Sequence, residues 1–112
     1  MGPVALTLLA LVAVAVVFAL ASFERLVKRQ HEVAHEQWVT DGRPPGFLWA
    51  GEESSIFNVW SRERAEIRVL FTTPRWIADD PTSRALRHRM RVSWIIALAS
   101  WAAWWPAAFL GL

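Results

Sequence analysis

His31, Glu32 and His35 form an H-E-x-x-H motif, which carries the most specific chemical meaning of any pattern in this sequence. On an α-helix the two imidazoles stand one turn apart and can share a zinc ion, while the glutamate acts as a general base. Such a site needs a third protein ligand. The acids at a plausible separation are Glu52 and Glu53, but they lie in a Gly/Ser-rich segment rather than on a second helix.

Positive charge near this motif argues against a bound dication. Lys28 and Arg29 lie about one helical turn before the histidines, and like charges repel. The chain is also short for building a substrate cleft. We therefore expect no catalytic residue, no enzyme activity and no metal, although His31 and His35 are the metal-ligand candidates of the sequence. A zinc metallopeptidase is the third interpretation of the function.

The distribution of charge defines the elements that position these residues. Every Lys, Arg, Asp and Glu of the 112-residue chain lies between Glu24 and Arg91. An uncharged apolar helix of about 20 residues matches the hydrocarbon thickness of a bilayer and satisfies its own backbone there. The sequence therefore predicts an all-α membrane protein, a helical hairpin with transmembrane helices over 1–23 and 92–112 and a helical cytoplasmic middle over 24–91.

A cleavable signal peptide is the alternative for the first apolar segment. Small residues at Ala19 and Ala21 resemble a cleavage site. However, no Lys or Arg precedes Val4, and the apolar run is long for a signal. We therefore expect the segment to be retained as a membrane helix.

The orientation follows from the basic residues beside the two apolar segments. These are Arg25, Lys28, Arg29, Arg84, Arg87, Arg89 and Arg91. No basic side chain flanks either outer end, so the positive-inside rule places the middle in the cytoplasm and both termini in the periplasm. We expect a multi-pass protein of the bacterial inner membrane.

Helix signals divide the middle around a Pro/Gly break at 42–51. Three helical stretches are predicted: an extension of the first membrane helix to about Trp38, a helix from Ile56 to about Phe71, and a helix that begins at Asp80-Pro81 and continues into the second membrane segment. Ser54 or Ser55 is expected to cap the second stretch. Pro106 is expected to kink the third helix near its outer end.

The helix predicted from Ile56 is amphipathic. Its apolar side comprises Ile56, Val59, Trp60, Ile67 and Phe71, and its polar side comprises Arg62, Glu63, Glu66 and Arg68. Two interpretations are open: the helix lies in the membrane interface, or its apolar side covers the core of the hairpin. The residues expected at the interface are Trp60, Arg84, Arg87, His88 and Arg91.

Tryptophan and alanine mark the second membrane segment. Trp104 and Trp105 fit an aromatic belt at the outer interface, whereas Trp101 lies deeper. Small residues favour close helix packing in lipid. The residues expected to contact a partner, a lipid or a pigment are Trp94, Ala97, Trp101, Trp105 and Ala108. With no ionisable side chain in either segment, we expect no cofactor of the chain's own, and contact only with lipid, carotenoid or tetrapyrrole held by neighbours.

These features favour a non-catalytic accessory subunit of a larger membrane complex. Photosynthetic reaction-centre–antenna and respiratory assemblies are the preferred settings, because such assemblies commonly hold small additional subunits. The expected partners are other membrane-protein subunits and lipid. No nucleic acid is expected, since acids and bases are interleaved and form no polybasic arm.

The layout resembles the universal stress protein B family of small bacterial two-helix membrane proteins. The resemblance rests on short motifs: His35-Glu36-Gln37-Trp38, then Gly42 and Pro44, then Asp80-Pro81 and the arginine-rich run Arg84–Arg91. The high Trp content and the Arg43-Pro44-Pro45-Gly46 turn depart from it. The resemblance implies no enzyme activity and offers an explanation of His35 unconnected to zinc. A stress-related, free-standing small membrane protein is accordingly the main alternative function.

Overall fold

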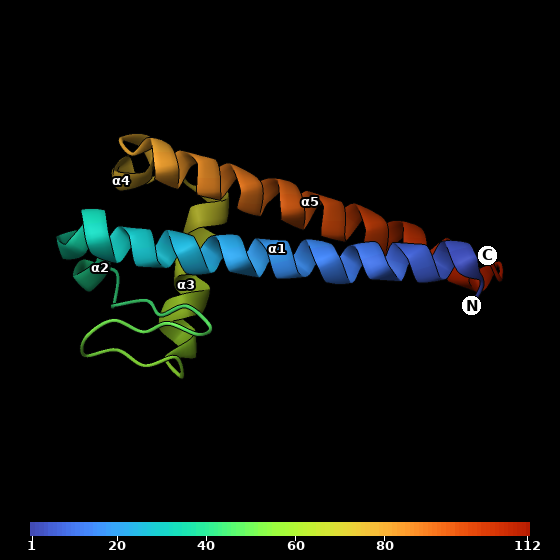
Figure 1. Cartoon of the computed structure of the whole chain (residues 1–112), viewed down its shortest axis with the longest axis horizontal. Helices are drawn as coiled ribbons and strands as arrows, with labels where there is room; N and C mark the ends of the chain where they lie inside the picture. The colour runs from blue at the N-terminus through green and yellow to red at the C-terminus, as the bar shows by residue number, and fades with distance from the viewer.

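The uncharged ends of the chain lie in two long helices that pack side by side (Figure 1). A computed structural model describes all residues, 1–112, as α-helices and loops without strands. The two long helices are α1 (Pro3–Val33) and α5 (Pro81–Phe109). They form a hairpin within a molecule 52 Å long. Its two termini meet, since the Val4 N–H donates to the carbonyl of Leu112 at 2.7 Å.

Small side chains fill the contact between α1 and α5 along the uncharged half of the hairpin. The buried residues of this half are Ala5, Ala15, Ala19, Ser22, Ala97, Ser100 and Ala107. Small residues let helix backbones approach closely, so the larger apolar side chains are turned outward. Only 17% of the most apolar window of each helix is buried. Both helices are long and apolar enough to cross a membrane.

Three shorter helices form the charged end of the molecule. They are α2 (His35–Thr40), α3 (Val59–Phe71) and α4 (Arg75–Ala78). A loop over 41–58 connects α2 to α3. In Figure 1, α3 crosses the hairpin at a steep angle rather than running along it.

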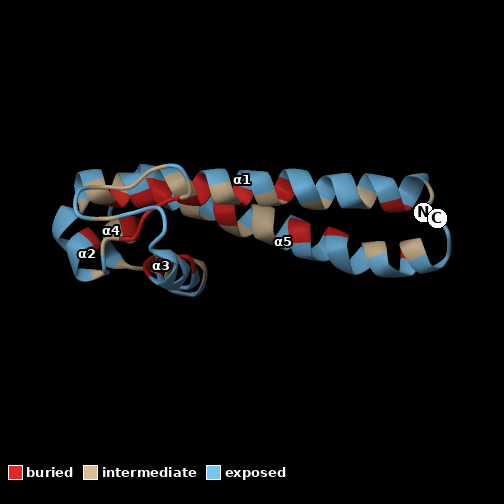
Figure 2. Ribbon diagram, turned by 90° about the horizontal axis from the view of Figure 1, so that it is seen from below, coloured by how far each residue is buried: buried red, intermediate tan, exposed pale blue.

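The main core lies where α3 and α4 meet the hairpin, at the start of the charged region. Its buried members are Phe23, Leu26 and Val27 of α1, Ala65 and Val69 of α3, Ile77 of α4, and Leu86 and Met90 of α5. Figure 2 shows this concentration of buried residues at one end of the hairpin. Burial of apolar area stabilises the fold, so this cluster joins four helices into one unit.

The sequence predicts that the first helix is continuous to about Trp38, but the structure shows a break. Ala34 leaves the helical region (φ −140°, ψ 53°), so α1 ends at Val33 and the short α2 follows. The two histidines of the motif consequently lie on different helices. The predicted extent of helix is nearly right, but its continuity is wrong.

The helix predicted from Ile56 begins three residues later, at Val59. Its cap is Asn58, whose side-chain oxygen accepts a hydrogen bond from the Ser61 N–H at 3.4 Å. Ser55 instead accepts from the Phe57 N–H within the preceding turn. The cap prediction is therefore wrong, because the serine side chains bond to the loop.

The predicted start of the last helix is confirmed. The Asp80 carboxylate accepts hydrogen bonds from the backbone N–H of Ser83 at 3.1 Å and from its hydroxyl at 2.6 Å. It also accepts two bonds from the Arg29 guanidinium, at 2.9 and 3.0 Å. First these bonds from Arg29 and then those from Ser83 hold the pKa of Asp80 well below its usual range. One carboxylate thus caps α5 and fastens it to α1.

The orientation of α3 excludes the interpretation that its apolar side covers the core of the hairpin. Its buried residues are Ser61, Ala65, Glu66 and Val69. Trp60 and Phe71 of the predicted apolar side are instead exposed, by 81% and 79%. The small Ser61 and Ala65 side chains permit the close crossing, and the large rings are left on the outer surface.

Glu66 is a buried acid that the sequence analysis placed on the polar side. Burial raises the pKa of its carboxyl to about 7, the neighbouring Glu63 adds to the rise, and Arg62 opposes it. One carboxylate oxygen of Glu66 has no hydrogen-bond partner. Burying a charged group without a partner is unfavourable, so ionisation of Glu66 destabilises the fold.

We expect Glu66→Gln to remove a pH-dependent loss of stability. Since the pKa is about 7 in the folded chain against an ordinary value of 4.5, the wild-type free energy of unfolding falls as pH rises from about 4.5 to 7. Above pH 7, the free energy of unfolding of the wild type should lie about 1–2 kcal/mol below that of Glu66→Gln, after allowance for solvent screening. Unfolding in detergent at pH 5 and pH 8 measures it. The exposed Glu36→Gln is the control, and equal pH dependence in wild type and Glu66→Gln would contradict the assignment.

Candidate functional site

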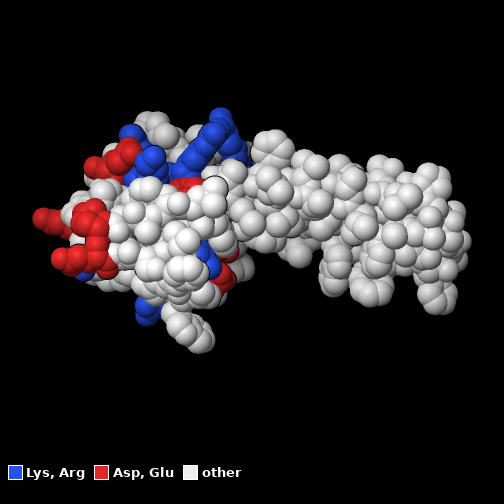
Figure 3. Space-filling view, turned by 60° about the horizontal axis from the view of Figure 1, so that its bottom comes forward, with Lys and Arg blue, Asp and Glu red and all other residues white.

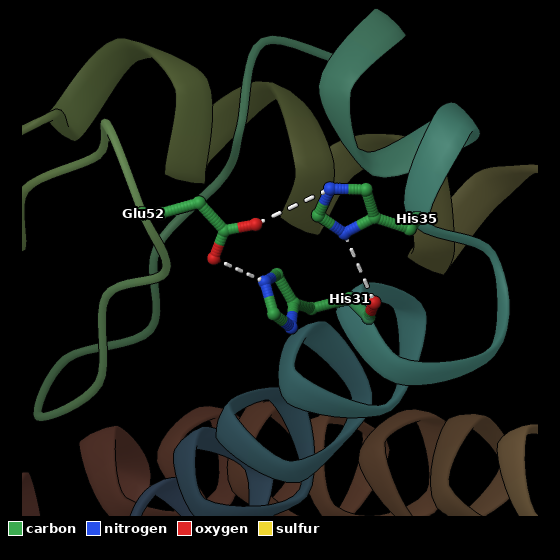
Figure 4. A group of neighbouring side chains, drawn as sticks. All are labelled: His31, His35 and Glu52. Carbon is green, nitrogen blue, oxygen red and sulfur yellow. Dashed lines mark hydrogen bonds and ion pairs between the residues drawn. The ribbon is translucent and has the colours of Figure 1, made fainter.

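The structure brings Glu52 to both histidines of the H-E-x-x-H motif. One oxygen, Oε2, lies 2.7 Å from Nε2 of His31, and the other, Oε1, lies 3.2 Å from Nε2 of His35. These potential ligand atoms all lie within 4.8 Å of one another. Figure 4 shows the carboxylate reaching from the loop toward the two rings. Glu52 is one of the two acids that the sequence provides as a third ligand, and although it lies in a loop, the fold brings that loop to the motif.

The break at Ala34 sets the relative position of the two imidazoles. His31 lies in the last turn of α1 and His35 begins α2. Nδ1 of His35 lies 3.2 Å from the backbone carbonyl of His31, which can only accept a hydrogen bond. This bond orients the His35 ring with Nε2 toward Glu52.

Two tryptophans form an apolar wall beside His31. The His31 ring makes edge-on contacts with Trp38, at 4.7 Å between ring centroids, and with Trp49, at 5.1 Å. Trp38 is fully buried and its indole N–H donates to the carbonyl of Pro44 at 3.0 Å. The aromatic cluster therefore binds the loop on one side and orients a histidine on the other.

Polar contacts fasten the rest of the 41–58 loop. The Glu24 carboxylate accepts hydrogen bonds from the backbone N–H groups of Phe47 and Leu48. Arg43 and Glu53 form an ion pair at 2.9 Å across the loop. The position of Glu52 is thus determined by contacts on both sides of it.

The positive charges near the motif are directed elsewhere. Arg29 is occupied by Asp80, and Lys28 lines a surface depression together with Arg25 and Arg89 rather than the histidine site. The pKa of the Glu52 carboxyl lies below its ordinary value, chiefly because its own backbone N–H and then His31 stabilise the charged form. The local electrostatics therefore do not oppose a cation at this site.

Glu32, the residue that would be the general base of a peptidase, does not join the group. The cluster comprises His31, His35 and Glu52, and Glu32 is exposed outside it. The arrangement offers three ligands without a positioned base. It has the chemistry of a binding site and gives the peptidase interpretation no support.

The residues expected to contact a partner in the second membrane segment differ in exposure. Trp101 and Trp105 are 50% and 56% exposed, whereas Ala97 is only 3% exposed. Trp94 is half-buried and packs against the main core, and Ala108 is also half-buried. The hairpin itself uses the surface of Ala97, so the expected partner contact is corrected to exclude that residue.

The residues expected at the interface also divide into two groups. Arg87 donates to the carbonyl of Val69 at 3.1 Å and to the Thr73 hydroxyl at 2.9 Å, which satisfies the end of α3. Arg84 donates to the carbonyl of Ala78 at 2.5 Å. These two arginines therefore bond to neighbouring parts of the chain, a role that the sequence pattern does not reveal. Trp60 and His88 are exposed.

Arg91, the last residue of the interface set, lines an apolar groove between the C-terminal end of α3 and α5. Its volume is about 430 Å³, and its lining residues are Leu70, Phe71, Arg91, Trp94, Ile95 and Leu98. Nε of Arg91 and the indole nitrogen of Trp94 lack hydrogen-bond partners within the protein. The groove joins the exposed side of α3 to the beginning of the uncharged segment of α5.

No protein-family model matches this chain, and no curated protein or solved structure is significantly similar to it.

Proposed function

We propose that this chain is a two-span protein of the bacterial inner membrane and a non-catalytic accessory subunit of a larger complex, with photosynthetic and respiratory assemblies as the preferred settings. The observation that carries the proposal is the exposure of large apolar side chains on the charged end. Leu48, Phe57, Trp60 and Phe71 are exposed by 92%, 83%, 81% and 79%. Exposed apolar patches mark interaction surfaces, so these side chains require a bilayer or a partner to cover them.

The charge pattern supports the membrane part of the proposal. Figure 3 shows Lys, Arg, Asp and Glu gathered at one end, while the remaining length of the hairpin is free of them. The basic residues flank the inner ends of both apolar segments. By the positive-inside rule, the charged end lies in the cytoplasm and the two adjacent termini lie in the periplasm.

The position of α3 supports its assignment as an interfacial helix. It crosses the hairpin near the boundary between the charged and uncharged parts (Figure 1). Phe71 shares a groove with Ile95 and Leu98 of the uncharged segment, and Arg91 lies beside them. An amphipathic helix at this level places its apolar side in the headgroup and acyl boundary. The bilayer thus covers the C-terminal part of α3.

The opposite end of α3, on the cytoplasmic side of the same interface, is the proposed contact with a partner subunit. Trp60 lies there, and the exposed Phe57 and Leu48 lie in the adjoining 41–58 loop. Within the membrane, Trp101 and Trp105 supply exposed rings that contact each other edge to face, with 6.0 Å between ring centroids. Without ionisable groups in the uncharged segments, association in lipid depends mainly on shape and dispersion. Any pigment or lipid there is held by the neighbouring subunits.

We expect the chain to co-purify with stoichiometric partner subunits when it is isolated from native membranes in mild detergent. Phe57→Ser combined with Trp60→Ser should lower partner recovery by about 10-fold, the loss typical of interface anchors. Trp101→Ala should lower it more than the matched variant Trp105→Ala, since Trp101 lies deeper in the membrane segment. Mass spectrometry of the recovered chains measures each ratio.

Recovery of the wild-type chain without a stoichiometric partner would overturn the proposal and favour a free-standing membrane protein. If Trp101→Ala retains its partners while the Phe57/Trp60 variant loses them, attachment lies in the cytoplasmic part alone. The intramembrane contact would then be lipid packing.

A further inference from the structure

The hydrogen bond of His35 directs its second ring nitrogen toward Glu52. Nδ1 donates to the carbonyl of His31, and Nε2 then lies 3.2 Å from a carboxylate oxygen of Glu52. A carbonyl bond to one nitrogen is the usual arrangement that orients a metal-bound histidine.

The spacing of the three groups fits a tetrahedral metal ion. Ligands at 2.0–2.1 Å from Zn²⁺ are about 3.3 Å apart in that geometry. Here one ligand atom from each residue lies within 4.8 Å of the other two, and the two oxygens of Glu52 lie 2.7 Å from Nε2 of His31 and 3.2 Å from Nε2 of His35. His35 and Glu52 are exposed, so their side chains are free to rotate toward the half-buried His31 ring to coordination distance.

The surroundings hold the site together on one side and leave it open on the other. Trp38 and Trp49 pack against the His31 ring. Gly51, which precedes Glu52, passes so close to the aromatic cluster that a Cβ there would lie 2.6 Å from the Trp38 ring and 3.0 Å from the His31 ring. Glu52 is exposed, so a water molecule can complete the coordination.

We propose that His31, His35 and Glu52 bind a divalent transition-metal ion of the Zn²⁺ class. Two imidazole nitrogens and one carboxylate oxygen form a donor set that suits Zn²⁺ and disfavours the all-oxygen ions Mg²⁺ and Ca²⁺. The ion fastens the 41–58 loop to the junction of α1 and α2. It is a structural clamp, because Glu32 is not positioned as a base. This inference is independent of the proposed role as a subunit.

Titration of the chelator-treated, tag-free full chain in detergent with Zn²⁺ tests the site. We expect about one ion per chain, and His31→Ala, His35→Ala and Glu52→Gln should each weaken the affinity by at least about 10-fold. Co²⁺ should show the visible absorption of four-coordinate cobalt in the wild type and lose it in the variants. Amide exchange in the loop should slow when Zn²⁺ binds.

Two variants serve as matched controls. Glu36→Gln removes an exposed carboxylate on α2 beside His35, and His88→Ala removes the third histidine of the chain, which lies on α5; both should retain wild-type affinity. Circular dichroism verifies that every variant keeps its helices. Zn²⁺ affinity of the wild type no tighter than that of a His31→Ala/His35→Ala double variant would overturn the proposal, as would unchanged affinity in Glu52→Gln.

Discussion

Replacement of Trp38 by alanine is expected to destabilise the charged end of the molecule by about 3–5 kcal/mol, the usual cost of removing a buried tryptophan. Trp38 is fully buried, and its indole N–H donates to Pro44. Its backbone carbonyl also accepts from the Arg43 N–H at 2.9 Å. The ring contacts Trp49 and His31. Its removal leaves a cavity beneath the 41–58 loop and releases that loop from α1.

Native-state amide exchange of Phe47 and Leu48 reports this opening, because both N–H groups are protected by hydrogen bonds to the Glu24 carboxylate. Trp38→Phe keeps a ring but loses the hydrogen bond to Pro44, so a smaller loss of about 1–2 kcal/mol is expected. The control is Trp60→Ala, which removes an exposed ring of the same size. Protection of the loop amides that is equal in Trp38→Ala and wild type would show that other contacts hold the loop.

Replacement of Asp80 by alanine is expected to lower the free energy of unfolding by about 2–4 kcal/mol, because it removes an N-cap and a partly buried ion pair together. The carboxylate satisfies the Ser83 N–H at the start of α5 and both bonds from Arg29. Its removal also leaves the half-buried Arg29 guanidinium without its partner. Since the pKa of Asp80 is lowered by folding, this stabilisation is present above its ordinary value of 3.8 and is lost only as pH falls below that value.

Unfolding in detergent at pH 7 measures the effect, with the neighbouring exposed acid in Asp79→Ala as control. Arg29→Met combined with Asp80→Ala completes a double-mutant cycle that separates the ion pair from the cap. A favourable coupling between Arg29 and Asp80, larger than the error of the cycle, is expected. Additive effects of the two single substitutions would mean that the cap alone carries the loss.

The local features of this protein could be predicted from its sequence. The uncharged segments predict two long apolar helices because a run of such residues has few alternatives, and both helices are present. Asp80-Pro81 predicts the start of α5 because cap and first-turn preferences act within a few residues. The Pro/Gly break at 42–51 likewise predicts a loop there, since proline forbids helix. Each of these features depends on neighbours along the chain.

The tertiary structure decided which side of α3 is buried. The amphipathic pattern left open whether Trp60 and Phe71 cover the hairpin core or face the membrane interface, and the protein buries Ser61 and Ala65 instead. The small side chains allow α3 to cross the hairpin closely, which the amphipathic pattern alone does not reveal. The same limit applies to Ala97, whose small side chain suits a contact within the hairpin as well as a contact with a partner.

The meeting of Glu52 with the two histidines is also decided only in three dimensions. The H-E-x-x-H pattern supplies His31 and His35, but the third group depends on the path of the 41–58 loop. That path requires Arg43 and Glu53 to adopt positive φ angles of 51° and 57°, a region that side chains disfavour. Packing around Trp38 and the bonds to Glu24 stabilise this path, and such contacts between residues distant in sequence leave no local pattern from which the site could be predicted.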